Sequence, residues 1–219
     1  MAQRDERHQL PGPAGIIEAC WENAESGRER WPQPLVAVIA HPHPLYGGAM
    51  DNKVVTTLAR MYRRLGVAAV RFNFRGVGGS AGSHDQGRGE VEDMLAVVRW
   101  AQARAPESAL LLGGYSFGSA IAAAVGENVA ARHLALVAPP VDRYPYAPQG
   151  DFACPTSIVL GGADDIVAVG AVAAWAHQRP RVTDVIVLPE ASHFFHGQLV
   201  ALERELGAAV SAVLAASAS

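Results

Sequence analysis

The sequence predicts an α/β fold with a mostly parallel, doubly wound sheet of about seven strands and helices on both faces. Short apolar runs, typical of strands covered on both sides, alternate with segments whose apolar residues recur at helical spacing. Glycine-rich loops follow several of these runs, where the carboxyl ends of parallel strands bind ligands. The run at residues 110–112 leads through Gly-Gly-Tyr-Ser-Phe-Gly into an alanine-rich segment, which predicts a strand, a tight turn and a helix.

Composition and charge favour a protein that acts on a small molecule. Half of the 219 residues are hydrophobic, enough for a full core, so we expect one α/β domain over residues 1–219. The net charge is −3 and the 18 Lys and Arg residues are spread along the chain, so neither a nucleic-acid partner nor a membrane surface is expected. The chain has no long apolar run and no apolar export signal near Met1, which favours a cytoplasmic location. Cys20 and Cys154 lack C-x-x-C spacing and are expected to be reduced packing residues.

The expected strands are short apolar runs bounded by polar, glycine or proline residues. Residues 35–40 are apolar throughout, as in a central strand, whereas residues 16–21 precede a polar turn and are expected at an edge of the sheet. Residues 1–13 have the composition of a frayed terminus. The full set of expected strands covers residues 16–21, 35–40, 67–74, 110–112, 134–138, 157–160 and 183–188.

The expected helices lie between these strands. Residues 52–65 carry apolar side chains at spacings of three and four, which predicts a one-faced helix that ends at Gly66. The proline-rich connection at residues 139–155 is too short for a helical cap domain, so an open site is expected. The expected helices cover residues 52–65, 90–104, the alanine-rich segment that begins at Ser116, 167–177 and 199–214.

Ser116 is the expected nucleophile. It is the central residue of a G-x-S-x-G pattern, in which the serine adopts a strained backbone conformation at the turn between strand and helix. Small residues at Gly114 and Gly118 let the strand and the helix pass close together. The N-terminus of the following helix lies beside the hydroxyl and favours negative charge on a bound carbonyl oxygen.

A serine nucleophile requires a base and a carboxylate that orients the base. His193 follows the last expected strand, where a sheet of this type can bring it over the nucleophile. Asp164 and Asp165 both lie between the serine and the histidine in chain order. Asp164 is favoured because it directly follows a strand and small residues, whereas Asp165 is one step closer to the next helix and could be its N-cap.

An oxyanion hole needs two N–H donors. One is expected from the backbone of Phe117, directly after the nucleophile, and the other from the His-Pro-His-Pro-Leu-Tyr loop after residues 35–40. Because proline has no N–H, the second donor is expected at His43, Leu45 or Tyr46, with Leu45 narrowly favoured over His43. His41 is expected to be a hydrogen-bonded residue that braces the turn.

The chain resembles a small, lidless member of the serine α/β-hydrolase superfamily, in the dienelactone-hydrolase-like branch. The resemblance implies cleavage of an ester or thioester through an acyl-enzyme formed on Ser116, without a cofactor. Dienelactone hydrolases use a cysteine at this position, so their own substrate is not carried over to this chain. Tyr46, Tyr115 and Phe194 are candidate pocket residues beside the motifs. The motifs that carry the resemblance are HPHPLYGG at residues 41–48 with DNKVV at 51–55, RFNFRGVGGS at 71–80, residues 114–118, residues 161–167 and SHFF at 192–195.

Three other functions fit parts of the sequence. Residues 76–81 match G-x-G-x-x-A, a nucleotide-binding pattern, but no helix follows at once to hold a pyrophosphate. His41, His43, His193 and His196 are conceivable metal ligands, but the H-x-H pattern is weak and no metal is expected. A binding protein that keeps the fold without useful turnover is the alternative to the hydrolase. Monomer and homodimer both remain compatible with the sequence.

Overall fold

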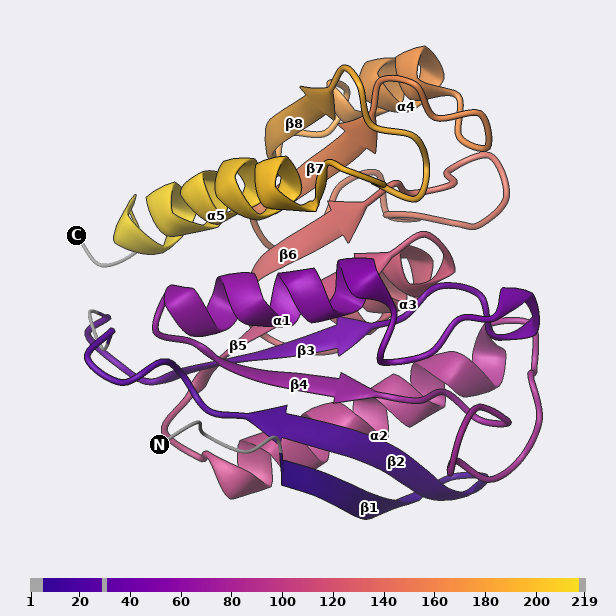
Figure 1. The fold of residues 1–219 in the computed structure, drawn as a ribbon, viewed down its shortest axis with the longest axis vertical. Coiled ribbons are helices and arrows are strands. Elements are labelled where there is room, and N and C mark those ends of the chain that lie inside the picture. The colour runs from indigo at the N-terminus through magenta and orange to yellow at the C-terminus, as the bar shows by residue number, and fades with distance from the viewer. Residues whose placement is uncertain (1–5, 29–30, 217–219) are drawn as a thin grey trace.

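The described part of the chain forms an eight-stranded sheet in the order β1-β2-β4-β3-β5-β6-β7-β8 (Figure 1). The structure is a computed structural model and describes residues 6–28 and 31–216. All the expected strands are confirmed, and one further strand precedes them. The strands are β1 (Glu6–Gly12), β2 (Gly15–Glu22), β3 (Leu35–Ala40), β4 (Ala68–Phe72), β5 (Ala109–Tyr115), β6 (Ala131–Val137), β7 (Thr156–Gly161) and β8 (Val182–Leu188).

The N-terminal hairpin departs from the sequence prediction. β1 pairs along its whole length with β2, and β2 also pairs with β4, both in antiparallel register. The prediction of a frayed segment at residues 1–13 is therefore wrong for residues 6–12, and residues 1–5 lie outside the described part. The prediction that residues 16–21 form an edge strand is also wrong, because β1 covers that edge. Leu10 is buried against the core, which holds an otherwise polar strand on the sheet.

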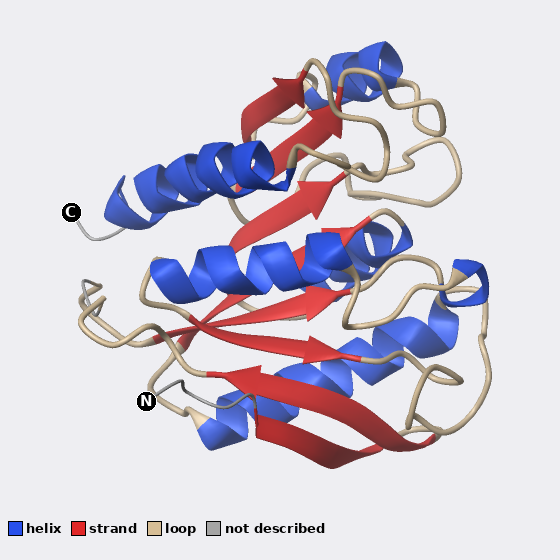
Figure 2. Ribbon diagram, viewed as in Figure 1, coloured by secondary structure: helices blue, strands red, loops and turns tan. Residues whose placement is uncertain are grey.

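Five helices cover the parallel part of the sheet (Figure 2). α1 and α5 pack on one face, and α2, α3 and α4 pack on the other. Residues 138–155 form turns without a helix, so no cap domain covers the sheet. No helix in the described ranges is long and apolar enough to cross a membrane. The helices are α1 (Lys53–Arg64), α2 (Arg88–Arg104), α3 (Phe117–Gly126), α4 (Val169–Ala176) and α5 (Leu199–Ala216), with a 3₁₀ turn η1 at Pro44–Tyr46.

The core consists of two apolar layers, one on each face of the sheet. On β3, Val36 and Val38 point into one layer and Ala37 and Ile39 into the other, and all are fully buried. This double burial explains the continuous apolar runs in the sequence, because both faces of each central strand exclude water. The strands β3 to β8 are parallel, so the loops after β3, β5, β7 and β8 meet at the carboxyl ends of the strands. These loops hold the candidate site.

A buried histidine lies near the amino ends of the strands, away from the candidate site. His133 Nε2 on β6 lies 2.9 Å from Ser157 Oγ on β7, and the Ser157 hydroxyl donates to Asp184 Oδ2 on β8 at 3.3 Å. His133 Nδ1 is buried without a hydrogen-bond partner in the described ranges. Burial lowers the pKa of His133 to about 4, so this imidazole is neutral near pH 7.

We expect the free energy of unfolding to fall as the pH decreases from 6.5, the ordinary pKa of histidine, towards the folded-state value of about 4. In this window the unfolded chain binds a proton at His133 that the folded chain does not. The expected loss is on the order of 3 kcal/mol from this residue. Urea denaturation at several pH values should show a shallower pH dependence for His133→Gln than for the wild type.

The exposed His177 provides the control for this experiment. His177→Gln makes the same replacement at the surface, so a change of pH dependence seen only in His133→Gln comes from the buried position. A His133→Gln variant with the wild-type slope would show that His133 does not contribute to the loss of stability in acid.

Candidate active site

Ser116 lies on a sharp turn between β5 and α3. Its backbone has φ 52° and ψ −120°, a left-handed conformation that is strained for a residue with a side chain. A Cβ at Gly114 would lie 2.1 Å from Gly118 O, and a Cβ at Gly118 would lie 2.4 Å from His41 O. Only glycine therefore allows α3 to begin this close to the ends of β5 and β3. The predicted succession of strand, tight turn and helix is confirmed.

The structure brings together Ser116, His193 and Asp164, the three residues that the sequence predicted as a triad. Ser116 Oγ lies 3.1 Å from His193 Nε2, and His193 Nδ1 lies 2.8 Å from Asp164 Oδ2. The carboxylate can only accept, so it fixes the tautomer with the proton on Nδ1 and leaves Nε2 free to accept the serine proton. His193 is only 4% exposed, so water competes little for these contacts.

Asp164, rather than Asp165, contacts the histidine. Asp164 Oδ1 accepts hydrogen bonds from the backbone N–H groups of Ile166 and Val167, both at 2.8 Å. Burial opposes ionisation of Asp164, but the hydrogen bonds from His193 and from these two N–H groups outweigh it and hold its pKa below the usual value. Asp165 borders the nearby cavity. The idea that Asp165 caps the next helix is wrong, because the N-cap of α4 is Ala168.

Tyr115 and Phe195 hold the loop that carries His193 in place. The Tyr115 hydroxyl donates to the His193 carbonyl oxygen at 2.9 Å, and the two rings lie 5.6 Å apart. Phe195, with φ 53°, is fully buried and directs the chain back into the core. Tyr115 is 2% exposed, so among the candidate pocket residues it is mainly a support for the histidine.

The loop after β3 uses two of its N–H groups internally. Leu45 N–H donates to His43 Nδ1 at 3.2 Å, and Tyr46 N–H donates to His43 O at 3.1 Å. The N–H groups of His43 and Phe117 have no acceptor within the described residues, and both residues border the cavity at Ser116. This geometry shifts the preference for the second donor from Leu45 to His43.

His41 occupies a structural position, as the sequence predicted. Its Nδ1 lies 2.6 Å from Pro42 O, and its Nε2 accepts the Phe74 N–H at 3.0 Å. Burial lowers the pKa of His41 to about 4, so the ring is neutral and can accept this hydrogen bond. No group of three or more His, Cys, Asp or Glu side chains is placed to hold a metal ion in residues 6–28 and 31–216.

A cavity of about 520 Å³ opens at Ser116 and His193. Tyr46 is 87% exposed and Phe194 is 52% exposed at its mouth, so the site is open to solvent. Sequence reasoning missed the contribution of residues 140–144, because a proline-rich connection carries no signal that places it against the site. The aromatic lining consists of Tyr46, Tyr115, Phe117, Tyr144 and Phe194, and the charged or amide lining of Asn52, Arg143 and Asp165.

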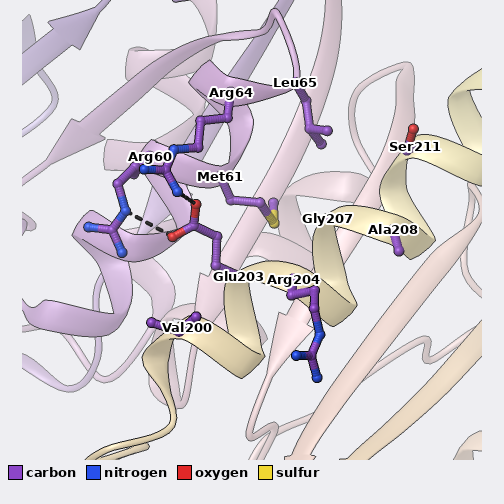
Figure 3. A pocket seen from close by; sticks show the side chains of 10 residues that line it. All are labelled: Arg60, Met61, Arg64, Leu65, Val200, Glu203, Arg204, Gly207, Ala208 and Ser211. Carbon is purple, nitrogen blue, oxygen red and sulfur yellow. Dashed lines mark hydrogen bonds and ion pairs between the residues drawn. The ribbon is translucent and has the colours of Figure 1, made fainter.

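A second hollow, of about 640 Å³, lies between α1 and α5 (Figure 3). Arg60 and Arg64 converge on Glu203, and Arg60 Nε lies 2.9 Å from Glu203 Oε2. The lining contains no histidine or cysteine, and its one serine is Ser211. This hollow therefore offers no nucleophile with a base, unlike the cavity at Ser116.

The contact between Ser157 and His133 is also unsuited to nucleophilic attack. Both residues are fully buried. Asp184 contacts the serine rather than the histidine, so no carboxylate of the described residues orients the imidazole. The Ser116 site differs on both points, since it borders a cavity and has its histidine paired with Asp164.

Comparisons with known proteins agree with the fold. The family model for the alpha/beta hydrolase fold matches residues 48–142. RP471, an uncharacterized protein of Rickettsia prowazekii, is 36% identical over 195 residues, which span 84% of this chain and 79% of that protein.

Two solved structures resemble the whole chain. XC6422 from Xanthomonas campestris, described as an α/β serine hydrolase without a lid, superposes with a TM-score of 0.86 at 36% identity and covers 94% of this chain and 93% of its own. An α/β serine hydrolase homologue from Coxiella burnetii gives 0.84 at 40% identity, with coverages of 92% and 95%. The chain thus belongs to the α/β hydrolase family, among the serine hydrolases without a lid.

Proposed function

We propose that this protein hydrolyses a carboxylic ester or thioester through an acyl-enzyme on Ser116. The observation that carries the proposal is the chain of contacts from Asp164 through His193 to Ser116 Oγ, at 2.8 and 3.1 Å, beside an open cavity. A serine hydroxyl is a weak nucleophile at neutral pH, and a base at hydrogen-bond distance removes that limit.

The proposed reaction has two halves. Ser116 Oγ attacks the substrate carbonyl carbon while His193 Nε2 accepts the hydroxyl proton, and Asp164 stabilises the resulting imidazolium. The N–H groups of His43 and Phe117 donate to the oxyanion of the tetrahedral intermediate, and the N-terminus of α3 adds its dipole. His193 then protonates the departing alcohol or thiol. A water molecule attacks the acyl-enzyme in the same way and releases the acid and Ser116.

The cavity favours a small acyl substrate. Its volume of about 520 Å³ lies at the lower end of the range for small-molecule sites, and its aromatic walls suit an apolar acyl or alcohol group. No cap encloses the substrate, so an ester on a larger molecule could also reach Ser116 if its carbonyl group is exposed. The chain length of the acyl group is the first property to measure. Nucleic acid is not a proposed partner.

The direct test compares wild type and Ser116→Ala on p-nitrophenyl esters and acyl-thioesters of increasing chain length. We expect hydrolysis to fall by at least about 10⁴-fold without a change in melting temperature, because only the nucleophile is removed. Fluorophosphonate labelling followed by mass spectrometry should place the label on Ser116.

Ser157→Ala is the matched control, since this serine also contacts a histidine but is buried at the other end of the strands. It should keep both activity and label. Wild-type hydrolysis by Ser116→Ala would overturn the mechanism. A wild type with no label and no turnover on any substrate would instead indicate a binding protein.

Asp164→Asn should lower kcat by roughly 10² to 10⁴-fold, because an amide neither fixes the histidine tautomer nor stabilises the imidazolium. Asp165→Asn, one residue away, should remain close to wild type because Asp165 does not contact His193 in the described structure. Steady-state kinetics on the best ester from the first series provides the measurement. Equal losses in both variants would contradict the assignment of Asp164.

His43→Pro tests the second oxyanion donor. His43 has φ −55°, which proline can adopt, so this change removes the N–H without forcing a new backbone conformation. His43→Ala removes the same ring but keeps the N–H. We expect kcat of the proline variant to lie about 10² to 10³-fold below that of the alanine variant. Equal kcat values would exclude the His43 N–H as a donor.

A further inference from the structure

His84 packs behind the proposed oxyanion hole. Its ring centroid lies 4.7 Å from that of His43 and 5.7 Å from that of Phe117, while His43 and Phe117 lie 4.8 Å apart. The three rings thus form one cluster, and two of its members carry the proposed N–H donors. His84 itself does not line the cavity, and its side chain is 12% exposed.

A buried carboxylate fixes His84. Glu90 is fully buried, and its Oε1 lies 2.9 Å from His84 Nδ1, a close contact without the alignment of a hydrogen bond. The same carboxylate accepts the N–H groups of Asp85 at 2.9 Å and Gly87 at 2.8 Å. Glu90 therefore ties the end of the glycine-rich loop to the first turn of α2.

The other end of this loop is anchored as firmly. Arg75 donates to the fully buried Asp93 from its backbone N, Nε and Nη2, at 2.9, 3.0 and 2.9 Å. Charge-assisted hydrogen bonds in a buried site are strong and directional. The loop between Arg75 and Glu90 thus presents His84 from two fixed points on α2.

The tip of the loop after β3 has little packing of its own. Leu45 is 70% exposed and Tyr46 is 87% exposed, so the turn after β3 depends on the contacts of His43 for its position. Burial, followed by the neighbouring His84, lowers the pKa of His43 and so favours its neutral ring. In the tautomer with the proton on Nε2, Nδ1 accepts the Leu45 N–H. His43 therefore links the turn to the ring cluster.

We propose that His84, held by Glu90, is a positioning residue that keeps the His43 and Phe117 N–H groups aimed at one carbonyl oxygen. This inference rests on the proposed hydrolase function. Oxyanion donors act only at about 2.7 to 3.1 Å from the developing charge, so a small displacement of His43 would weaken catalysis without removing any catalytic group.

The test compares an ester with its thionoester, in which sulfur replaces the carbonyl oxygen. Sulfur is larger and a weaker hydrogen-bond acceptor than oxygen. The kcat/KM of the ester divided by that of the thionoester therefore measures how well the oxyanion donors are aligned. A loss of folded enzyme lowers both rates equally and leaves the ratio unchanged. We expect His84→Ala to lower the ratio by about 10-fold or more, mainly through kcat with little change in KM.

Two further variants make the result decisive. His84→Phe keeps a ring against His43 and Phe117 and should recover most of the ratio, whereas His196→Ala, at an exposed histidine, should match the wild type. A wild-type ratio for His84→Ala, or a phenylalanine variant as defective as the alanine variant, would overturn the inference. A wild type that hydrolyses no ester would overturn the proposed function itself, so the two failures are distinguishable.

Discussion

The site depends on a backbone contact that only glycine permits. Gly114 and Gly118 allow the first turn of α3 to lie against the ends of β5 and β3, and Ser116 is held in a strained conformation between them. The central strands are packed on both faces, and this packing holds the turn in place, so the strained conformation of Ser116 persists. The hydroxyl, the N-terminus of α3 and the loop after β3 consequently share one small region.

Five of the histidines differ in their burial and in the partners of their rings. His41 and His133 lie in the interior, and the cost of burying a charge keeps both neutral and structural. His193 is almost as buried but faces Asp164, whose carboxylate can stabilise a positive imidazolium when a proton arrives. His43 and His84 lie between these extremes, where rings pack against each other beside the site. A carboxylate at Nδ1 combined with a serine hydroxyl at Nε2 separates the proposed base from His41 and His133.

The two ends of the sheet illustrate why placement decides chemistry. Ser157 and His133 meet at 2.9 Å near the amino ends of the strands, closer than the 3.1 Å between Ser116 and His193. The loops at the carboxyl ends leave the cavity at Ser116, and there a carboxylate contacts the imidazole on the side away from the serine. The shorter contact is part of the core, and the longer one is the candidate active site.

The sequence by itself determined the elements and the turn that presents Ser116, because apolar periodicity, glycine spacing and chain order are local properties. It predicted the central strands, the five helices, the turn at Ser116 and the order of Ser116, Asp164 and His193. Only the tertiary structure placed Asp164 rather than Asp165 against His193, paired the Leu45 N–H with the His43 ring, and placed β1 on the sheet. These outcomes depend on hydrogen bonds and packing between segments distant in the chain. A shift of one position along the chain turns a side chain in the opposite direction, but it leaves the apolar pattern that predicts the elements unaltered.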